Sequence, residues 1–535
     1  MAYNDIDTDF ILSGISEGFR IVDKGATPIP ANVDNYKSAL ARQDQVEKQI
    51  LTEIQEKRYI ITHSKPPLIS ALGALDKPNG GIRLIHDCSQ PKGQGALNEY
   101  ATLPWTIKYQ TVDDAVDIIK TMPAPYLAKV DLKSAYRSVA IHKDNYQFTG
   151  LKWRFSGQTD YTYFFDSALC FGSRFAPGIF HRLSMAVMRM MHHRGYQCVC
   201  YLDDFLIITE SKEEGTRGLT ELLTLLRGLG FAIAWDKVVP PTRRLTFLGI
   251  DIDTVTMTLA IPQHKVDDLL QTISIFTKKR RASLRQLQQL AGRLAFCSRV
   301  VHGGRVYLQR VLDLMRPLQH PAHKARLSEG FHLDLQWWVT LLTQRNFKPM
   351  SRILQGIVRI QTDACSSGGG ALSSDGSWLY TDWHYDFPQL KHCHINIKEA
   401  FTAVLSVCQW APRLRNSHVI IETDNIFTRA ALNRGACRDP LLMACLREMW
   451  WLSTVYNFKV KSVHIAGALN ILADSLSRLR HGFGHFLFWL SLIGPLAGPP
   501  FTMSDIESLC VGHMSINTFY VVLQQVLPRI PWWID

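Results

Sequence analysis

Short apolar runs alternate with polar breaks along most of this chain, and several of the runs end in an acidic residue. The segment 195–209 joins two runs rich in Val, Ile, Tyr, Phe and Cys, with Asp203 and Asp204 between them. These residue types favour β-strands, so the pattern predicts a β-hairpin with both carboxylates at its tip. A polar turn explains such a pair. A metal site also explains it, because adjacent carboxylates raise each other's pKa unless a cation neutralises them.

A second strand-like run, residues 126–131, ends at Asp131 and leads into a turn and the start of a helix. If this strand lies beside the hairpin, Asp131 meets Asp203 and Asp204. Three carboxylates can hold two Mg²⁺ ions about 4 Å apart, the arrangement that supports in-line phosphoryl transfer. The pattern therefore indicates nucleotidyl transfer.

Four further segments of the first 301 residues have clear patterns. Residues 72–90 form two strand-like runs joined by a Pro-Asn-Gly-Gly turn, and residues 221–238 predict a helix ended by Gly228 or Gly230 and followed by a strand. Residues 244–253 are a further apolar segment. Residues 284–301 predict an amphipathic helix, which carries Gln288, Gly292 and Phe296 at i, i+4 and i+8 on one face.

Strands ending in acids recur in the second half of the chain. The strand 356–363 ends at Asp363 and precedes an expected turn at Gly368-Gly369-Gly370 and another strand, 371–383. Three more acids follow: Glu399 in the first turn of a helix over 396–410, Asp424 at the end of a strand over 417–425 and before a helix, and Asp474 ten residues after His464. The preference of acids for helix N-termini explains Glu399 when it is taken alone. Together the four carboxylates suit two-metal hydrolysis of a phosphodiester by water.

The composition is that of a globular chain, with 46% hydrophobic and 20% charged residues among 535, which excludes a disordered chain. At about 100 to 200 residues a domain, several domains are expected. The net charge of +12 favours a polyanionic partner. The stretch 278–310 has no acid and nine cations: Lys278, Lys279, Arg280, Arg281, Arg285, Arg293, Arg299, Arg305 and Arg310. A solvated face usually mixes signs, so this stretch favours phosphate contact.

The start of the chain lacks the basic and apolar regions of a signal peptide, and eleven cysteines are scattered along it. We therefore expect reduced thiols and a cytoplasmic and/or nuclear protein that is not secreted. Cys198 and Cys200, and the His392-Cys393-His394 run, are interpreted as packing residues rather than metal ligands. The apolar run 486–501 is short and broken by Gly and Pro, so it predicts a docking segment and no membrane span.

The order of the first set of motifs resembles that of reverse transcriptases: Asp131, Tyr136, the stretch 171–180, then Tyr201-Leu202-Asp203-Asp204. The resemblance implies that Asp131 and Asp203 are the principal metal ligands and that Asp204 supports them. Tyr136 would be the aromatic gate that excludes a ribose 2′-hydroxyl, although it could merely cap a core.

The flanking segments resemble the same family. Residues 72–90 resemble the fingers hairpin, which implies that Lys77 and Arg83 bind the triphosphate, and the loop 171–180 would place Phe171 and Gly172 under the nucleotide. Cys170 stands where the family usually has Pro. Lys237 matches a lysine that helps to protonate pyrophosphate.

Two segments resemble elements that bind the primer and template. Phe247, Leu248 and Gly249 match the primer grip. The helix 284–301 resembles a thumb helix that tracks the minor groove, which implies nucleic-acid contacts at these positions: Gln288, Gly292, Phe296, Arg285 and Arg293. A helix-packing glycine is the other explanation of Gly292.

The second set, Asp363, Glu399, Asp424 and Asp474, resembles ribonuclease H in order and surroundings, with His464 as its mobile histidine. Residues 414–460 are most similar to DIRS-type elements, which encode a tyrosine recombinase, or to other long-terminal-repeat retroelement polymerases. The resemblance implies two Mg²⁺ ions per active site, with Mn²⁺ as an alternative. It implies binding of RNA template, DNA primer, RNA–DNA hybrid and dNTPs, and other retroelement proteins as partners, such as a recombinase or an integrase and a nucleocapsid protein.

The expected fold is a mixed α/β and α+β one: a right-hand polymerase followed by a ribonuclease H-like α/β domain. The expected boundaries are an N-terminal extension (1–45), fingers and palm (46–255), thumb and connection (256–352), ribonuclease H domain (353–482) and a C-terminal tail of unknown role (483–535). The expected function is RNA-directed DNA polymerase with ribonuclease H activity. The alternative is a domesticated, catalytically silent nucleic-acid-binding or scaffold protein, although removal of acids would be expected in such a remnant and all seven are present.

Overall fold

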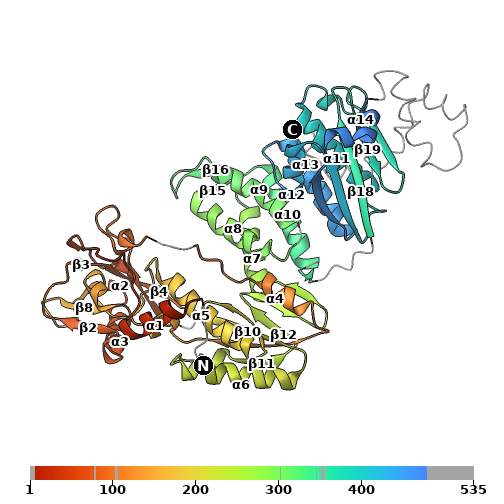
Figure 1. Ribbon diagram of the computed structural model, residues 1–535. Helices are drawn as coiled ribbons and strands as arrows, with labels where there is room; N and C mark the ends of the chain where they lie inside the picture. Colours follow the sequence, from red (N-terminus) through yellow and green to blue (C-terminus); the bar gives the residue numbers. More distant parts are fainter. Residues whose placement is uncertain are drawn as a thin grey trace, which may run out of the picture. The chain divides into compact units, whose positions relative to one another are not determined.

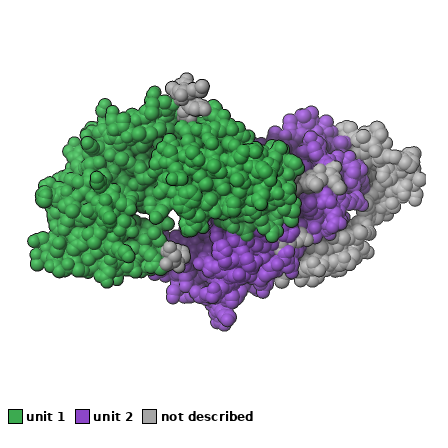
Figure 2. Space-filling model, turned by 90° about the horizontal axis from the view of Figure 1, so that it is seen from below, with its two compact units in different colours: residues 1–258 green, residues 259–535 purple. Residues whose placement is uncertain are grey.

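The computed structural model describes residues 6–77, 80–102, 106–301, 303–344, 346–350 and 356–478. The chain divides into two compact units, residues 1–258 and 259–535 (Figures 1 and 2). The division falls close to the expected boundary between residues 255 and 256.

The centre of unit 1 is a four-stranded antiparallel sheet of order β11-β6-β10-β9. Its strands are β6 (Tyr126–Asp131), β9 (Gln197–Tyr201), β10 (Asp204–Thr209) and β11 (Val239–Thr242), and the helices packed on it are α4 (Val112–Ile119), α5 (Ala176–His193) and α6 (Lys212–Gly228). The run Phe205–Thr209 of β10 is buried throughout, which explains its uninterrupted apolar sequence. The sheet positions the ends of β6 and β10 side by side.

A second region of unit 1 carries a five-stranded sheet of order β1-β3-β7-β8-β2 and a separate hairpin, β4-β5. The strands are β1 (Ala31–Asn32), β2 (Tyr59–Thr62), β3 (Leu68–Ile69), β4 (Ala71–Asp76), β5 (Ile82–Asp87), β7 (Gly150–Trp153) and β8 (Thr162–Asp166), with helices α2 (Lys37–Leu40) and α3 (Gln43–Gln55) beside them. The two runs expected in residues 72–90 are confirmed as β4 and β5. Pro78 and Asn79 of their turn lie outside the described residues.

The N-terminal segment is part of unit 1 and is not a separate extension over its described residues. After α1 (Thr8–Glu17), the side chains of Phe19 and Ile21 are buried in the core beneath the central sheet. Asp7 forms ion pairs of 2.6 and 2.8 Å with Arg182 and Arg189 of α5. The expected boundary at residue 45 therefore does not separate two folded bodies, because apolar burial joins them.

The first part of unit 2 is mainly helical, with α7 (Gln263–Thr277), α8 (Leu284–Cys297), α9 (Gly304–Met315), α10 (Glu329–Gln344) and the short strands β15 (Arg281–Ser283) and β16 (Lys324–Arg326). The hairpin of β12 (Arg244–Phe247) and β13 (Ile250–Asp253) precedes these helices in the chain. Two short strands, β14 (Thr258–Ala260) and β17 (Lys348–Pro349), lie directly before α7 and after α10 in the sequence. A buried carboxylate, Asp334 on α10, pairs with Arg310 at 2.9 Å and with Arg447 at 3.3 Å.

The second part of unit 2 is a five-stranded mixed sheet of order β20-β19-β18-β21-β22, with β18, β21 and β22 parallel and β18, β19 and β20 antiparallel. Its strands are β18 (Gly356–Ala364), β19 (Gly368–Ser373), β20 (Trp378–Asp382), β21 (Ser417–Thr423) and β22 (Lys459–His464). The helices are α11 (Ile395–Trp410), α12 (Ile426–Arg434), α13 (Pro440–Val455) and α14 (Ile471–Ser477) (Figure 1). Helices α11 and α14 both contact β18, so they bring their polar residues to its end.

The turn expected at Gly368-Gly369-Gly370 is wrong, because these glycines lie within β19. A Cβ on Gly369 would lie 2.3 Å from Thr402 Oγ1, and a Cβ on Gly370 would lie 2.6 Å from the Ser477 backbone nitrogen. The glycines therefore serve close packing of α11 and α14 on a strand. The strand expected over 371–383 is divided into β19 and β20 by a turn at residues 374–376.

Three other local expectations differ from the structure. The helix expected after Asp131 is a single 3₁₀ turn, Ala135–Ser138. The strand expected after α6, within residues 221–238, begins only at Val239, as β11, and Ile233 makes an isolated bridge to Leu132. Residues 176–180 belong to α5 rather than to a loop, with Pro177 in the first turn, where its missing N–H costs nothing.

Among the residues that the structure describes, no helix combines the length and the apolarity needed to cross a bilayer. The apolar run 486–501 and the segment 483–535 lie outside the described residues.

Candidate active sites

Three carboxylates gather at one end of the central sheet of unit 1. Asp131 ends β6, and Asp204 begins β10 as its partner across the antiparallel pair. Asp203 lies in the two-residue loop between β9 and β10, and its carbonyl accepts a hydrogen bond of 3.0 Å from the Leu132 N–H. The expected hairpin, with its acids at the tip, is confirmed.

The hairpin loop is held in an unfavourable backbone conformation. Leu202 has φ of 53°, a left-handed geometry that costs a non-glycine residue about 1–2 kcal/mol. A two-residue loop requires positive φ at its first position. Ser184 Oγ of α5 donates a hydrogen bond of 2.6 Å to the Leu202 carbonyl, and packing on the core holds the leucine. The loop therefore presents Asp203 in a fixed position.

The three acids differ in their electrostatic surroundings. Lys237 Nζ lies 3.1 and 3.2 Å from the two carboxylate oxygens of Asp131, and Lys129 Nζ lies 3.0 Å from Asp204 Oδ1. Burial raises the pKa of Asp203, and the charge of Asp131 raises it further. Burial also raises the pKa of Asp204, and Lys129 opposes this shift. Asp131 and Asp203 line the adjacent pocket, whereas the charge of Asp204 is matched from within the sheet.

This pocket has a volume of about 800 Å³ and unites five of the residues expected to bind a nucleotide: Lys77, Arg83, Tyr136, Phe171 and Lys237. The rings of Tyr136 and Phe171 lie 5.1 Å apart, and the Arg83 guanidinium lies 5.8 Å from the Phe171 ring centroid. Cations from the β4-β5 hairpin and carboxylates from the central sheet therefore face one cavity, as a triphosphate with bound metal requires.

Tyr136 contacts both the core and the pocket. Its ring packs against Phe180 in the core at 5.4 Å and also lines the pocket. Gly172 is required for two reasons: its φ is +125°, and a Cβ there would lie 2.2 Å from the His86 carbonyl oxygen. Its own carbonyl accepts a hydrogen bond of 2.9 Å from Asn98 Nδ2.

The pocket floor contains a buried ion network that the sequence patterns did not reveal. Arg137 pairs with Glu53 at 2.9 Å and with Asp166 at 2.8 Å, and all three residues line the pocket. Its position directly after Tyr136 was the one available signal.

Beside this network lie the buried side chains of His86 and Cys170. The hydrogen bond with Cys88 lowers the pKa of the Cys170 thiol to about 5, and His86 reinforces this shift. Burial alone would lower the pKa of His86, but Cys170 and Asp166 raise it to about 9.

The expected nucleic-acid face of α8 is exposed. Gln288 and Gly292 are exposed, and Phe296 is half-buried with Lys265 Nζ 4.4 Å from its ring centroid. A Cβ on Gly292 would meet no described atom within 4 Å. The glycine therefore does not serve helix packing among the described residues, and close approach by a ligand stays a prediction.

The basic stretch is partly neutralised. Arg285 is exposed, but Arg293 pairs with Asp268 of α7 at 3.0 Å, and Arg310 pairs with Asp334. Arg310 is the more buried of these two arginines, whereas Arg293 is 44% exposed and its ion pair lies at the surface.

The expected role of Phe247 needs correction. Its side chain is fully buried, because inward-facing positions of β12 pack on the core, and it offers no surface to nucleic acid. Leu248 and Gly249 form the loop of the β12-β13 hairpin, with φ of 48° and 74°.

The second carboxylate cluster lies at the end of β18 in unit 2. Ligand oxygens of Asp363, Glu399 and Asp424 all lie within 4.8 Å of one another. Ser477 Oγ donates a hydrogen bond of 2.7 Å to Asp363 Oδ2. The buried Glu399 Oε2 has no hydrogen-bond partner among the described residues. Glu399 lies beyond the first turn of α11, which begins at Ile395, so the helix N-terminus does not account for it.

Burial and mutual repulsion raise the pKa values of Glu399 and Asp363 in this cluster. Burial raises the pKa of Glu399 to about 9, and Asp363 and Asp424 add to the shift. Burial also raises the pKa of Asp363 to about 6 against the hydrogen bond from Ser477. A divalent cation reverses both effects, because it compensates the buried negative charge. The donor set, oxygen atoms only, fits a hard divalent ion.

The other two expected residues lie at the margin of this cluster. Asp474 on α14 is half-buried and pairs with Arg478 at 2.7 Å, and its charge contributes to the raised pKa of Asp363. His464 is exposed at the end of β22, in register with Thr423 of β21. The structure therefore unites three of the four acids within ligand distance.

The fold is that of a right-hand polymerase followed by a ribonuclease H-like domain, as expected from the sequence. Residues 83–252 match the family model described as "Reverse transcriptase (RNA-dependent DNA polymerase)". Over these residues the chain is similar to reverse transcriptases.

Three similar proteins illustrate the relationship. The "Enzymatic polyprotein" of Cauliflower mosaic virus (strain D/H) is 27% identical over 325 residues, which cover 58% of this chain and 44% of the relative. The "Transposon Tf2-3 polyprotein" of Schizosaccharomyces pombe is 22% identical over 442 residues, covering 78% and 30%. A foamy viral protease-reverse transcriptase solved in complex with RNA/DNA hybrid has a TM-score of 0.53 at 14% identity, covering 87% and 61%. The chain therefore spans less than half the length of the curated relatives that it matches.

Proposed function

We propose that this chain is an RNA-directed DNA polymerase with ribonuclease H activity, which copies retroelement RNA into DNA and degrades the RNA of the resulting hybrid. The observation that carries the proposal is the pair of carboxylate clusters in one chain. One borders a pocket of about 800 Å³ that also bears cations and aromatic rings, and the other brings ligand oxygens of three acids within 4.8 Å of one another. Each cluster can hold divalent metal ions, which serve both the synthesis and the hydrolysis of phosphodiesters.

At the polymerase site, Asp131 and Asp203 would hold the metal ions, and Asp204 would support them. Two Mg²⁺ ions, or Mn²⁺, would supply activation of a primer 3′-hydroxyl and neutralisation of the leaving pyrophosphate. Lys77 and Arg83 would bind the triphosphate, and Tyr136 would exclude a 2′-hydroxyl.

Lys237 is the proposed proton donor to pyrophosphate. Burial lowers its pKa, but the hydrogen bond and charge of Asp131 more than offset this, so the pKa is raised and the amine stays protonated. The family match and the pocket geometry support the binding of divalent metal ions. We propose Mg²⁺ or Mn²⁺ as the ion, with two ions per site.

At the second site, Asp363, Glu399 and Asp424 would hold two Mg²⁺ ions with Asp474, and a water molecule would be the nucleophile. The unpartnered, buried Glu399 Oε2 supports this assignment, since a metal would satisfy it. His464 would assist product release from its exposed place beside Asp424.

The proposed ligands are an RNA template, a DNA primer, their hybrid and dNTPs. The exposed face of α8, with Gln288 and Gly292, and the Leu248-Gly249 loop would contact the duplex. Three expectations stay predictions. They are the binding of other retroelement proteins, such as a recombinase or an integrase and a nucleocapsid protein, a cytoplasmic or nuclear location, and the DIRS-type lineage.

Extension of a labelled DNA primer on an RNA template tests the proposal. Wild-type protein with Mg²⁺ or Mn²⁺ should extend the primer to the template end, and Asp203→Asn should abolish extension. If folded wild-type protein binds the hybrid but makes no product with either ion, the silent nucleic-acid-binding alternative is correct.

A further inference from the structure

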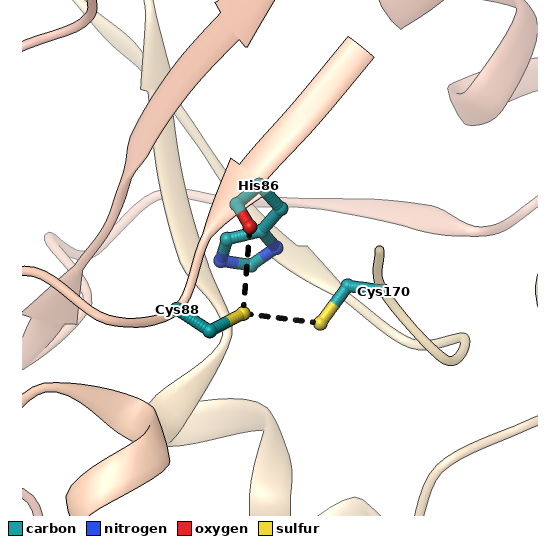
Figure 3. A group of neighbouring side chains, drawn as sticks. All are labelled: His86, Cys88 and Cys170. Carbon is teal, nitrogen blue, oxygen red and sulfur yellow. Dashed lines mark hydrogen bonds between the residues drawn. The ribbon is translucent and has the colours of Figure 1, made fainter. Parts of the chain in front are cut away.

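A buried group of one histidine and two cysteines lies next to the nucleotide pocket but outside both carboxylate clusters. Ligand atoms of His86, Cys88 and Cys170 lie within 4.8 Å of one another, and all three residues are buried. Figure 3 shows them converging from two separate segments: His86 and Cys88 at the end of β5, and Cys170 from the segment before Phe171.

The His86 ring has no hydrogen-bond partner among the described residues. This holds for both ring nitrogens, although the residue is only 4% exposed. Asp166 Oδ2 lies 3.7 Å from His86 Nδ1, and Arg137 holds that carboxylate from the other side. A carboxylate behind one nitrogen orients an imidazole so that the other nitrogen can bind a metal.

The distance between the sulfurs is nearer to that of a metal site than to that of a disulfide. Cys88 Sγ and Cys170 Sγ lie 3.5 Å apart. Two thiolates bound to a tetrahedral zinc ion at about 2.3 Å lie about 3.8 Å apart, whereas disulfide sulfurs lie about 2.05 Å apart. A metal thus requires a shift of about 0.3 Å, and a disulfide requires about 1.5 Å.

We propose that His86, Cys88 and Cys170 form a binding site for a thiophilic divalent cation of the zinc type. Two thiolates, a neutral imidazole and a divalent ion carry no net charge, so the occupied site is compatible with burial. His86 and Cys170 also line the 800 Å³ pocket, from which a water molecule can reach the fourth coordination position.

The consequence of binding is structural. The ion links the end of β5, the strand that bears Arg83, to the segment that bears Phe171 and Gly172. It therefore fixes two walls of the nucleotide pocket relative to each other. The site depends only on the geometry of unit 1, so it stands or falls independently of the proposed polymerase activity.

Metal loading of the full chain tests the proposal. Tag-free, reduced protein is incubated with Zn²⁺ or Co²⁺ in excess Mg²⁺, which occupies the carboxylate clusters, and is then desalted. We expect one equivalent of retained Zn²⁺ by elemental mass spectrometry, and a thiolate-to-cobalt charge-transfer band with Co²⁺. Cys88→Ser and Cys170→Ser should each lose the band and the retained equivalent.

Cys198→Ser is the matched control, because Cys198 is also a buried thiol of unit 1 but lies outside this group. It should keep the band. If a serine variant fails to fold, His86→Gln provides a second test, with a shifted or lost band. Absence of a Mg²⁺-resistant equivalent in folded wild-type protein, or its persistence in Cys88→Ser, overturns the proposal. A disulfide between Cys88 and Cys170 in place of a metal overturns it as well.

Discussion

Replacement of Glu399 by glutamine should stabilise the metal-free protein around the second site at neutral pH. Glu399 is buried beside Asp363 and Asp424, and its pKa is raised from 4.5 to about 9. The folded state therefore keeps a proton that the unfolded state releases. Glutamine has nearly the same shape as glutamate but does not ionise. The substitution therefore removes the free-energy cost of a buried carboxylate beside Asp363 and Asp424.

The size of the effect follows from linkage. Between pH 4.5 and 9, a carboxyl with this raised folded-state pKa loses about 1.4 kcal/mol of stability per pH unit as the pH rises. At pH 7.5 the loss reaches about 4 kcal/mol as an upper bound, which corresponds to about a thousand-fold in a local opening equilibrium. At pH 4.5 and below, the term vanishes, so wild type and variant should match there.

Hydrogen exchange of peptides from β18 and α11 measures this directly, with wild type and variant compared at the same pH so that intrinsic exchange rates cancel. Without metal at pH 7.5, exchange in Glu399→Gln should be much slower than in wild type. Mg²⁺ should slow exchange in wild type and have little effect on the variant.

Glu422→Gln is the control, since Glu422 lies on the adjacent strand β21 and pairs with Arg359. It should give no stabilisation without metal and should leave the Mg²⁺ response intact. Equal exchange in wild type and Glu399→Gln at pH 7.5, with equal responses to Mg²⁺, would show that the cluster is neither repulsive nor metal-binding.

Three further predictions concern single positions. Gly172→Ala should reduce dNTP incorporation at least ten-fold in a steady-state assay, because its Cβ would lie 2.2 Å from the His86 carbonyl oxygen; unchanged incorporation would contradict this. Gly292→Ala should raise the melting temperature slightly, since alanine favours a helix by about 1 kcal/mol and has free space there, yet weaken hybrid binding in a filter assay. Tighter binding by that variant would exclude close duplex contact. Asp203→Asn should abolish primer extension, whereas Asp204→Asn should retain measurable extension, because Asp204 is already paired within the sheet; equal losses would remove the distinction.

The carboxylates could be predicted from sequence because their positions follow local rules. An apolar run that stops at an acid predicts a strand end, as at Asp131 and Asp363, and sheets bring strand ends together. The β4-β5 hairpin and helix α11 were predictable for the same reason: each has a repeating pattern within one short segment.

Features that depend on distant packing were not predictable. Gly369 and Gly370 suggested a turn from the sequence alone. In the structure they lie in β19, because only glycine leaves room for α11 and α14 there. Phe247 could be placed on a hairpin, but its complete burial depends on the surrounding core. Cys88 and Cys170 are 82 positions apart in the chain, and only the fold places their sulfurs 3.5 Å from each other.

If one chain carries two independent metal-dependent sites, each reaction can be removed without the other. The most direct test follows both reactions in one tube, with a DNA primer and an RNA template that carry different labels. Wild type should extend the primer and cleave the RNA, Asp203→Asn should only cleave, and Asp424→Asn should only extend. Loss of both reactions in both folded variants, or neither reaction in folded wild type with Mg²⁺ or Mn²⁺, would contradict the account.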